Sequence, residues 1–95
     1  MADAPQAKTM WQVRVLVVDD ETFVRRLVRR MLNGLSVADI VEAVDGQEAL
    51  KLLRKFKADI VICDYQMEPM NGLEFLKIVR SGADPDVRRD LPVIM

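Results

Sequence analysis

The chain has 95 residues, enough for one small domain, and its 14 Lys and Arg against 15 Asp and Glu give a net charge of −1. This balance gives no electrostatic reason to expect binding to nucleic acid or to an acidic membrane. Hydrophobic residues make up 51% of the chain, which indicates a globular protein, and the absence of His excludes Ser-His and Cys-His catalytic pairs. The single Cys excludes an internal disulfide. No apolar segment approaches the roughly 18–20 residues that span a bilayer, and no signal peptide is visible, so we expect a cytoplasmic location.

The first third of the chain predicts a leader, a strand and a helix. Residues 1–11 are polar and Ala-rich, and we expect them to form a flexible leader before a folded domain at residues 12–95. The β-branched run at residues 13–18 predicts a buried strand. Apolar residues then recur at helical spacing, and Asn33-Gly34 is a signal for the end of that helix. This predicted apolar stripe comprises Phe23, Val24, Leu27, Val28, Met31, Leu32 and Leu35.

The middle of the chain repeats the alternation of strand and helix. Residues 40–43 predict a weaker strand at or near a sheet edge. The chain then turns at Asp45-Gly46, and a second helix follows. We expect this helix to be lined by Ala49, Leu50, Leu53 and Phe56. The pure apolar run at residues 60–63 has the length and composition of a central strand.

A third helix, a loop and a fourth strand complete the sequence. The third helix is marked by Leu73, Phe75, Leu76 and Val79. It should end near Ser81-Gly82, because glycine is common just after a helix. Residues 81–90 predict a polar loop, and residues 91–95 predict the fourth strand. Alternation of apolar strands with helices indicates an α/β fold, with helices on both faces of a doubly wound parallel sheet.

Acidic residues directly follow two of the predicted strands. Asp19 and Asp20 come after the first strand, and Asp64 comes after the third. Parallel strands share one carboxyl edge, so the three carboxylates converge if these two strands are neighbours, about 4.8 Å apart. Two unit charges 4 Å apart repel by about 4 kcal/mol at an effective dielectric of 20, so such a cluster needs a cation or a proton. An all-oxygen site of this kind favours Mg²⁺, which could draw in a phosphoryl group for attack by one carboxylate.

Simpler interpretations exist for individual charged residues. Asp20 alone could act as a helix N-cap, and Asp64 alone could be a loop acid. Four arginines of the first helix predict a solvent-exposed outer face, with a docking surface as the alternative. These are Arg25, Arg26, Arg29 and Arg30.

The order and spacing of five short motifs resemble those of the response regulator receiver domain. The matching stretches are residues 15–21 (VLVVDDE), 43–50 (AVDGQEAL), 59–67 (DIVICDYQM), 69–76 (PMNGLEFL) and 91–95 (LPVIM). The resemblance implies a flavodoxin-like sheet with strand order 2-1-3-4, and strand 5 and helices 4 and 5 are absent from this chain.

The resemblance also implies a role for each acidic residue. Asp64 would be the phosphoacceptor, taking a phosphoryl group from a histidine kinase or a histidine phosphotransfer protein. Mg²⁺ would be held by Asp19, Asp20, Asp64 and the backbone carbonyl of Gln66. The protein would then relay a signal to a partner and would not be an enzyme, although it would assist its own phosphorylation and dephosphorylation.

Two departures from the family pattern stand out. The family places Pro directly after the position of Met67, whereas here Glu68 intervenes before Pro69. The family also carries a Ser or Thr after strand 4 and a Lys after strand 5. Those positions lie beyond Met95, so neither role is assigned to a residue of this chain.

Two other functions remain open on the sequence. One is an interaction or assembly module without phosphoryl chemistry, which the unassigned Ser/Thr and Lys positions favour. The other is a Mg²⁺-dependent phosphohydrolase, although such enzymes usually carry an acid where Gln66 stands. The apolar fourth strand also predicts self-association through an open sheet edge.

Overall fold

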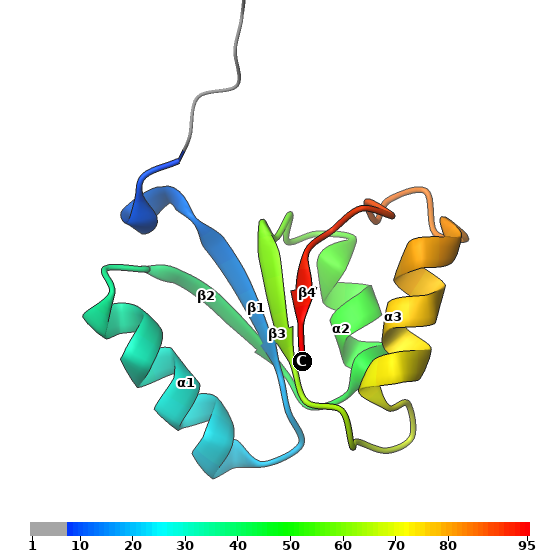
Figure 1. Cartoon of the computed structure of the whole chain (residues 1–95), viewed down its shortest axis with the longest axis horizontal. Coiled ribbons are helices and arrows are strands. Elements are labelled where there is room, and N and C mark those ends of the chain that lie inside the picture. Colours follow the sequence, from blue (N-terminus) through cyan, green and yellow to red (C-terminus); the bar gives the residue numbers. More distant parts are fainter. Residues whose placement is uncertain (1–7) are drawn as a thin grey trace, which may run out of the picture.

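The computed structural model describes residues 8–95, which form a four-stranded parallel sheet with helices on both faces (Figure 1). The strands are β1 (Arg14–Val18), β2 (Asp39–Ala43), β3 (Ile60–Cys63) and β4 (Val93–Ile94). The helices are α1 (Thr22–Gly34), α2 (Gly46–Leu53) and α3 (Gly72–Ser81). The strand order is β2-β1-β3-β4, which confirms the predicted fold class and places β1 beside β3.

Residues 8–12 connect the N-terminal segment to the sheet. A short 3-10 helix covers Met10–Gln12, and the Lys8 ammonium lies 2.9 Å from the Asp59 carboxylate. The rest of the predicted leader, residues 1–7, lies outside the described residues. Within residues 8–95, no helix is long and apolar enough to cross a membrane.

Local capping explains where α2 and α3 begin and end. The Asp45 carboxylate accepts a hydrogen bond from the Glu48 amide at 2.9 Å and caps α2. At the start of α3, Asn71 and Glu74 each accept a hydrogen bond from the other's backbone amide. Gly82 ends α3 with φ of 71°, a left-handed conformation that suits glycine.

The two faces of the sheet carry separate cores. Side chains such as Leu16, Val61 and Phe75 pack between the sheet and the α2–α3 pair. On the opposite face, Val15 and Val17 belong to a smaller cluster that includes residues of α1. Because alternate residues of β1 serve alternate faces, this strand is buried on both sides.

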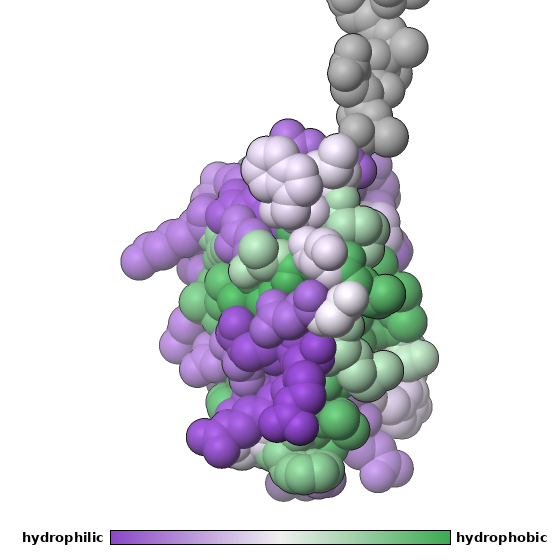
Figure 2. Space-filling view, turned by 90° about the vertical axis from the view of Figure 1, so that its left-hand side faces the viewer, coloured by the Kyte–Doolittle hydropathy of each residue, from purple (hydrophilic) through white to green (hydrophobic). Residues whose placement is uncertain are grey.

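The packing of α1 differs from the prediction of a single apolar stripe. Val28 and Leu32 pack on the sheet, whereas a neighbouring row of apolar side chains stays exposed. The exposed row comprises Phe23, Leu27, Met31 and Leu35. Figure 2 views the side on which α1 lies and shows strongly hydrophilic residues directly beside hydrophobic ones. The seven apolar residues cover a wider part of the helix surface than the sheet can bury, so some of them stay in contact with solvent.

Two predicted boundaries also differ. Helix α2 ends at Leu53, so Phe56 lies beyond it, but its side chain is still buried in the core. The fourth strand is only Val93–Ile94, not residues 91–95. Leu91 is buried beside it without being part of the ladder.

Candidate functional site

The sheet brings the acidic residues of two strands to one edge. Asp19 extends β1, and its amide donates to the Ala43 carbonyl at 3.1 Å. Asp64 extends β3, and its amide donates to the Val18 carbonyl at 2.8 Å. Backbone pairing with neighbouring strands therefore fixes both residues.

The carboxylates of Asp19, Asp20 and Asp64 form a cluster in which one oxygen of each residue lies within 4.8 Å of the others. Burial is graded across the cluster: Asp19 is 9% exposed, Asp64 is half-buried and Asp20 is exposed. Asp20, Asp64 and Gln66 also line an open cleft of about 990 Å³. The structure thus brings together the three acids that were expected to bind the metal, and it places Gln66 on the lining of the adjoining cleft.

Burial makes the ionised form of Asp19 costly. It raises the pKa of the Asp19 carboxyl, and the carboxylates of Asp64 and Asp20 raise it further. Two contacts oppose this rise in pKa: the Glu21 amide, which donates to Asp19 Oδ1 at 2.9 Å, and the positive charge of Arg25. A cation held between the three acids would remove the repulsion that remains.

The chemistry of this donor set fits Mg²⁺. All three side chains offer hard carboxylate oxygens, and the cleft leaves room for water ligands. The thiol of Cys63 lies nearby but is buried, and its Sγ lies 3.3 Å from the Asp64 carbonyl oxygen. Burial raises the pKa of this thiol to about 11, so it is protonated at neutral pH in the metal-free protein.

The loop after β3 is held close to Asp64. The Gly72 amide donates to the Tyr65 carbonyl at 2.8 Å. A Cβ atom at position 72 would lie 2.4 Å from the Asp64 carbonyl oxygen. Only glycine allows the start of α3 to approach the end of β3 so closely.

The departure at Glu68 changes the rim of the cleft and leaves the core intact. Met67 is 5% exposed and belongs to the larger hydrophobic core. Glu68 is exposed and lines the cleft beside Asp64. The residue therefore adds a negative charge at the cleft without displacing the buried side chain that anchors the loop.

Sequence reasoning missed two residues next to the site, Arg25 and Glu42. Arg25 was expected on an exposed outer face, but its side chain is only 12% exposed and forms an ion pair with Glu42 on β2. Arg29 pairs with the same carboxylate but keeps 38% of its side chain exposed. The prediction of a solvated face is therefore wrong for Arg25 and holds for the exposed Arg26 and Arg30. The available signal was Glu42 itself, an isolated acid inside an otherwise apolar part of β2.

Comparison with known proteins identifies the family. Residues 15–95 match the response regulator receiver domain, and the chain belongs to this family, which acts in two-component signalling.

Curated relatives include chemotaxis proteins and larger enzymes. The chain is 39% identical over 83 residues to chemotaxis protein CheY-3 of Vibrio cholerae, covering 87% of this chain and 62% of that protein. It is 36% identical over 87 residues to a protein-glutamate methylesterase/protein-glutamine glutaminase of Clostridium acetobutylicum, covering 90% of this chain and 24% of that protein. The chain therefore spans less than two thirds of the length of each of these relatives.

Solved structures show the same fold. The chemotaxis response regulator CheY4 of Vibrio cholerae superposes with a TM-score of 0.74 at 33% identity, covering 85% of this chain and 64% of that chain. The receiver domain of the histidine kinase CKI1 from Arabidopsis thaliana, complexed with Mg²⁺, gives a TM-score of 0.73 at 28% identity, with the same two coverages.

Proposed function

We propose that this protein accepts a phosphoryl group on Asp64, with Mg²⁺ bound beside it, and relays the signal to a partner. The donor would be a phosphohistidine of a histidine kinase or a histidine phosphotransfer protein, the partners with which receiver domains interact in two-component systems. The observation that carries the proposal is the convergence of three carboxylates, from the ends of β1 and β3, at an open cleft.

Exposure and hydrogen bonding favour Asp64 as the acceptor among the three acids. Asp19 is buried, and one of its carboxylate oxygens already accepts the Glu21 amide. Asp20 is exposed and follows Asp19 by one residue on the loop before α1. Asp64 lines the cleft, and its backbone is fixed by the Val18 carbonyl and by Gly72. An approaching phosphoryl group would meet this carboxylate with the other two acids beside it.

The proposed transfer exchanges one bond to phosphorus for another. An Asp64 carboxylate oxygen forms the new P–O bond as the P–N bond of the donor phosphohistidine breaks. The electron pair of the broken bond stays on the imidazole nitrogen, which takes up a proton from solvent. No oxidant or further substrate is needed for this step. We propose that the protein acts as a phosphoacceptor that assists its own phosphorylation and dephosphorylation, rather than as an enzyme that acts on many substrate molecules.

Mg²⁺ is the proposed cofactor, held by Asp19, Asp20 and Asp64 together with the backbone carbonyl of Gln66. When bound, it supplies positive charge to the phosphoryl oxygens. The oxygen-only donor set supports this choice, and so does the Mg²⁺ complex of the similar CKI1 receiver domain.

Phosphoryl uptake from a small donor such as acetyl phosphate tests the proposal. We expect Mg²⁺-dependent incorporation that levels off at one phosphoryl group per chain, because a single carboxylate is the acceptor. Continued release of many phosphates per chain would instead indicate a phosphohydrolase. Absence of both incorporation and turnover would support an interaction module and contradict the proposal.

We also propose that the 95-residue chain self-associates through the outer edge of β4. Val93 and Ile94 pair with β3 on one side, whereas no described strand pairs with the other side. Ile94 and Met95 are also about half exposed. An apolar edge strand with unpaired backbone groups is a template for a second strand. We therefore expect the mass measured by light scattering to rise with concentration.

A charged residue on this edge tests the proposed interface. Ile94→Lys should shift the equilibrium toward the monomer, since lysine on an edge strand opposes strand pairing. Val44→Lys introduces the same charge at another exposed apolar position, away from β4, and should leave association unchanged. A compact monomer at all concentrations, with strongly protected strand amides, would contradict the proposal.

A further inference from the structure

Asp19 accepts a hydrogen bond from a side chain of α1, in addition to its hydrogen bonds with β2 and with the loop that follows β1. Its carbonyl oxygen accepts a hydrogen bond of 2.7 Å from Arg25 Nη1. Its amide pairs with the Ala43 carbonyl, and its carboxylate accepts the Glu21 amide. The orientation of this buried acid therefore depends on three separate elements.

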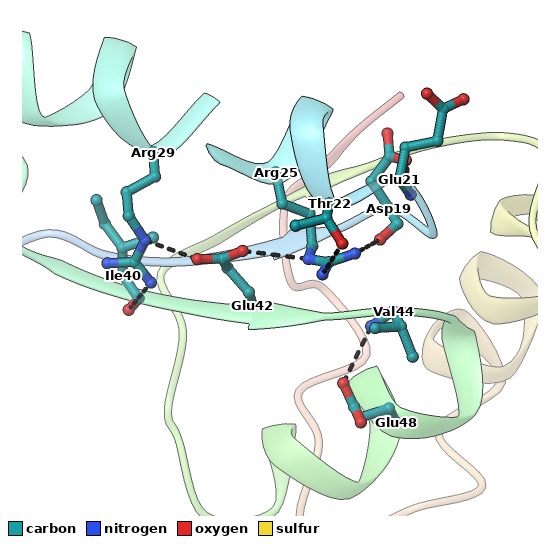
Figure 3. A network of polar contacts seen from close by, with 9 residues as sticks. All are labelled: Asp19, Glu21, Thr22, Arg25, Arg29, Ile40, Glu42, Val44 and Glu48. Carbon is teal, nitrogen blue, oxygen red and sulfur yellow. Dashed lines mark hydrogen bonds and ion pairs between the residues drawn. The ribbon is translucent and has the colours of Figure 1, made fainter. Parts of the chain in front are cut away.

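Arg25 uses all three nitrogens of its guanidinium group (Figure 3). Nε donates to Glu42 Oε1 at 3.1 Å, and Nη2 donates to Thr22 Oγ1 at 3.2 Å, while Nη1 reaches Asp19. The rigid planar fork of arginine allows one side chain to bind the edge strand β2 and the Asp19 loop at the same time.

Glu42 is itself fixed in place. Its second oxygen, Oε2, accepts from Arg29 Nε at 2.7 Å, and Arg29 Nη2 also donates to the Ile40 carbonyl at 3.1 Å. The hydrogen bond from Arg29, and the Arg25 contacts after it, lower the pKa of Glu42, so its carboxylate is ionised at neutral pH. Through its hydrogen bond to Glu42, Arg25 is attached to β2, a strand that contributes no residue to the acidic cluster.

The position of Arg25 on its helix also calls for an explanation. It is the fourth residue of α1, near the helix N-terminus, where the helix dipole disfavours a positive charge. The contacts with Glu42 and Asp19 offset this cost. If only helix stability mattered, an acidic residue would be more favourable at this position, because the helix dipole stabilises negative charge near the N-terminus.

We infer that Arg25 is a positioning residue for the metal centre, acting as a brace from β2 through Glu42 to the Asp19 carbonyl. This inference rests on the proposed function, because it assumes that Asp19 binds Mg²⁺. The brace would hold the turn from Asp19 to Glu21, and with it the direction of the Asp19 carboxylate. Partners of this kind commonly change metal affinity by about 10–100-fold when they are removed.

Arg25→Met tests the inference because a positioning role and simple electrostatics predict opposite changes in Mg²⁺ affinity. Removing a positive charge near a divalent-cation site strengthens Mg²⁺ binding if charge alone matters. Loss of the brace should instead weaken Mg²⁺ binding about tenfold in a calorimetric titration. It should also accelerate hydrogen exchange of the Glu21 amide in the metal-free protein, because that amide donates to Asp19.

Arg29→Met is the matched control. Arg29 lies one turn further along α1 and binds the same Glu42, but it has no hydrogen bond to Asp19. Arg29 helps to fix Glu42, but Arg25 keeps its own hydrogen bonds to Glu42 and Asp19 when Arg29 is lost. We therefore expect the Mg²⁺ affinity and the Glu21 amide exchange of Arg29→Met to stay within about twofold of the parent, a difference of about 0.4 kcal/mol. If Arg25→Met does not fold, Arg25→Gln is measured in its place, with the same expected direction.

Asp20→Asn separates failure of this inference from failure of the proposed function. If Asp20→Asn weakens Mg²⁺ binding while Arg25→Met leaves it unchanged or tighter, only the role of Arg25 is wrong. If Asp20→Asn also leaves Mg²⁺ binding unchanged, the metal centre itself lies elsewhere. Equal weakening in Arg25→Met and Arg29→Met would show a general effect of helix destabilisation and would likewise overturn the inference.

Discussion

In the intact protein, Asp64→Asn should reduce acid-labile phosphate incorporation to the background level. The asparagine amide fills the same space but does not provide the carboxylate nucleophile that forms an acyl phosphate. Asp19 is buried and does not line the cleft, whereas Asp20 lines it beside Asp64. We expect neither acid to replace Asp64, because both are proposed to hold Mg²⁺ rather than to accept the phosphoryl group. The measurement is labelling with a phosphoryl donor in the presence of Mg²⁺, followed by an acid-stability test of the product.

Asp45→Asn is the matched control for this experiment. Asp45 caps α2, and asparagine is an equally good N-cap, so this variant should fold and incorporate phosphate normally. The same change of one carboxylate to an amide is thus made outside the acidic cluster. Persistent labelling of Asp64→Asn would show that another residue accepts the phosphoryl group.

Gly72→Ala should destabilise the protein and also disturb the acceptor. The added Cβ would lie 2.4 Å from the Asp64 carbonyl oxygen and 3.1 Å from the Tyr65 Cα, so the backbone at the end of β3 must move. Overpacking against backbone of this kind costs about 2–3 kcal/mol. For a domain of this size, that corresponds to a fall in melting temperature of about 10–20 °C. Phosphate incorporation should also slow, because the Asp64 backbone shifts.

Gly34→Ala is the control for the loss of a glycine. Gly34 is the last residue of α1, and no atom lies within 4 Å of a Cβ built there. Alanine loses less conformational freedom on folding, so this variant should be as stable as the parent or more stable by up to about 1 kcal/mol. Equal melting temperatures for Gly72→Ala and the parent would contradict the close approach of α3 to the site.

The acidic site could be found from the sequence because its signals are local. Asp19, Asp20 and Asp64 each follow directly on a short apolar strand, and parallel strands end at one edge of the sheet. The fold class followed from the alternation of strands and helices, whereas the strand order was implied by the resemblance to receiver domains. The alternation depends on residues that are close in the chain, so pattern and composition were sufficient for the fold class.

Only the tertiary structure decided how the faces of α1 are used. Arg25 and Arg26 are adjacent in the chain but differ by about 100° around the helix, so one meets Glu42 on β2 while the other faces solvent. The same rotation leaves Leu27 exposed, whereas Val28 packs on the sheet.

Helical periodicity shows which residues share a face but not which face meets the sheet. That choice depends on how the helix docks, which is set by contacts between residues far apart in sequence. The ion pair between Arg25 and Glu42, and the link that it makes to Asp19, could therefore be seen only after the chain had been folded.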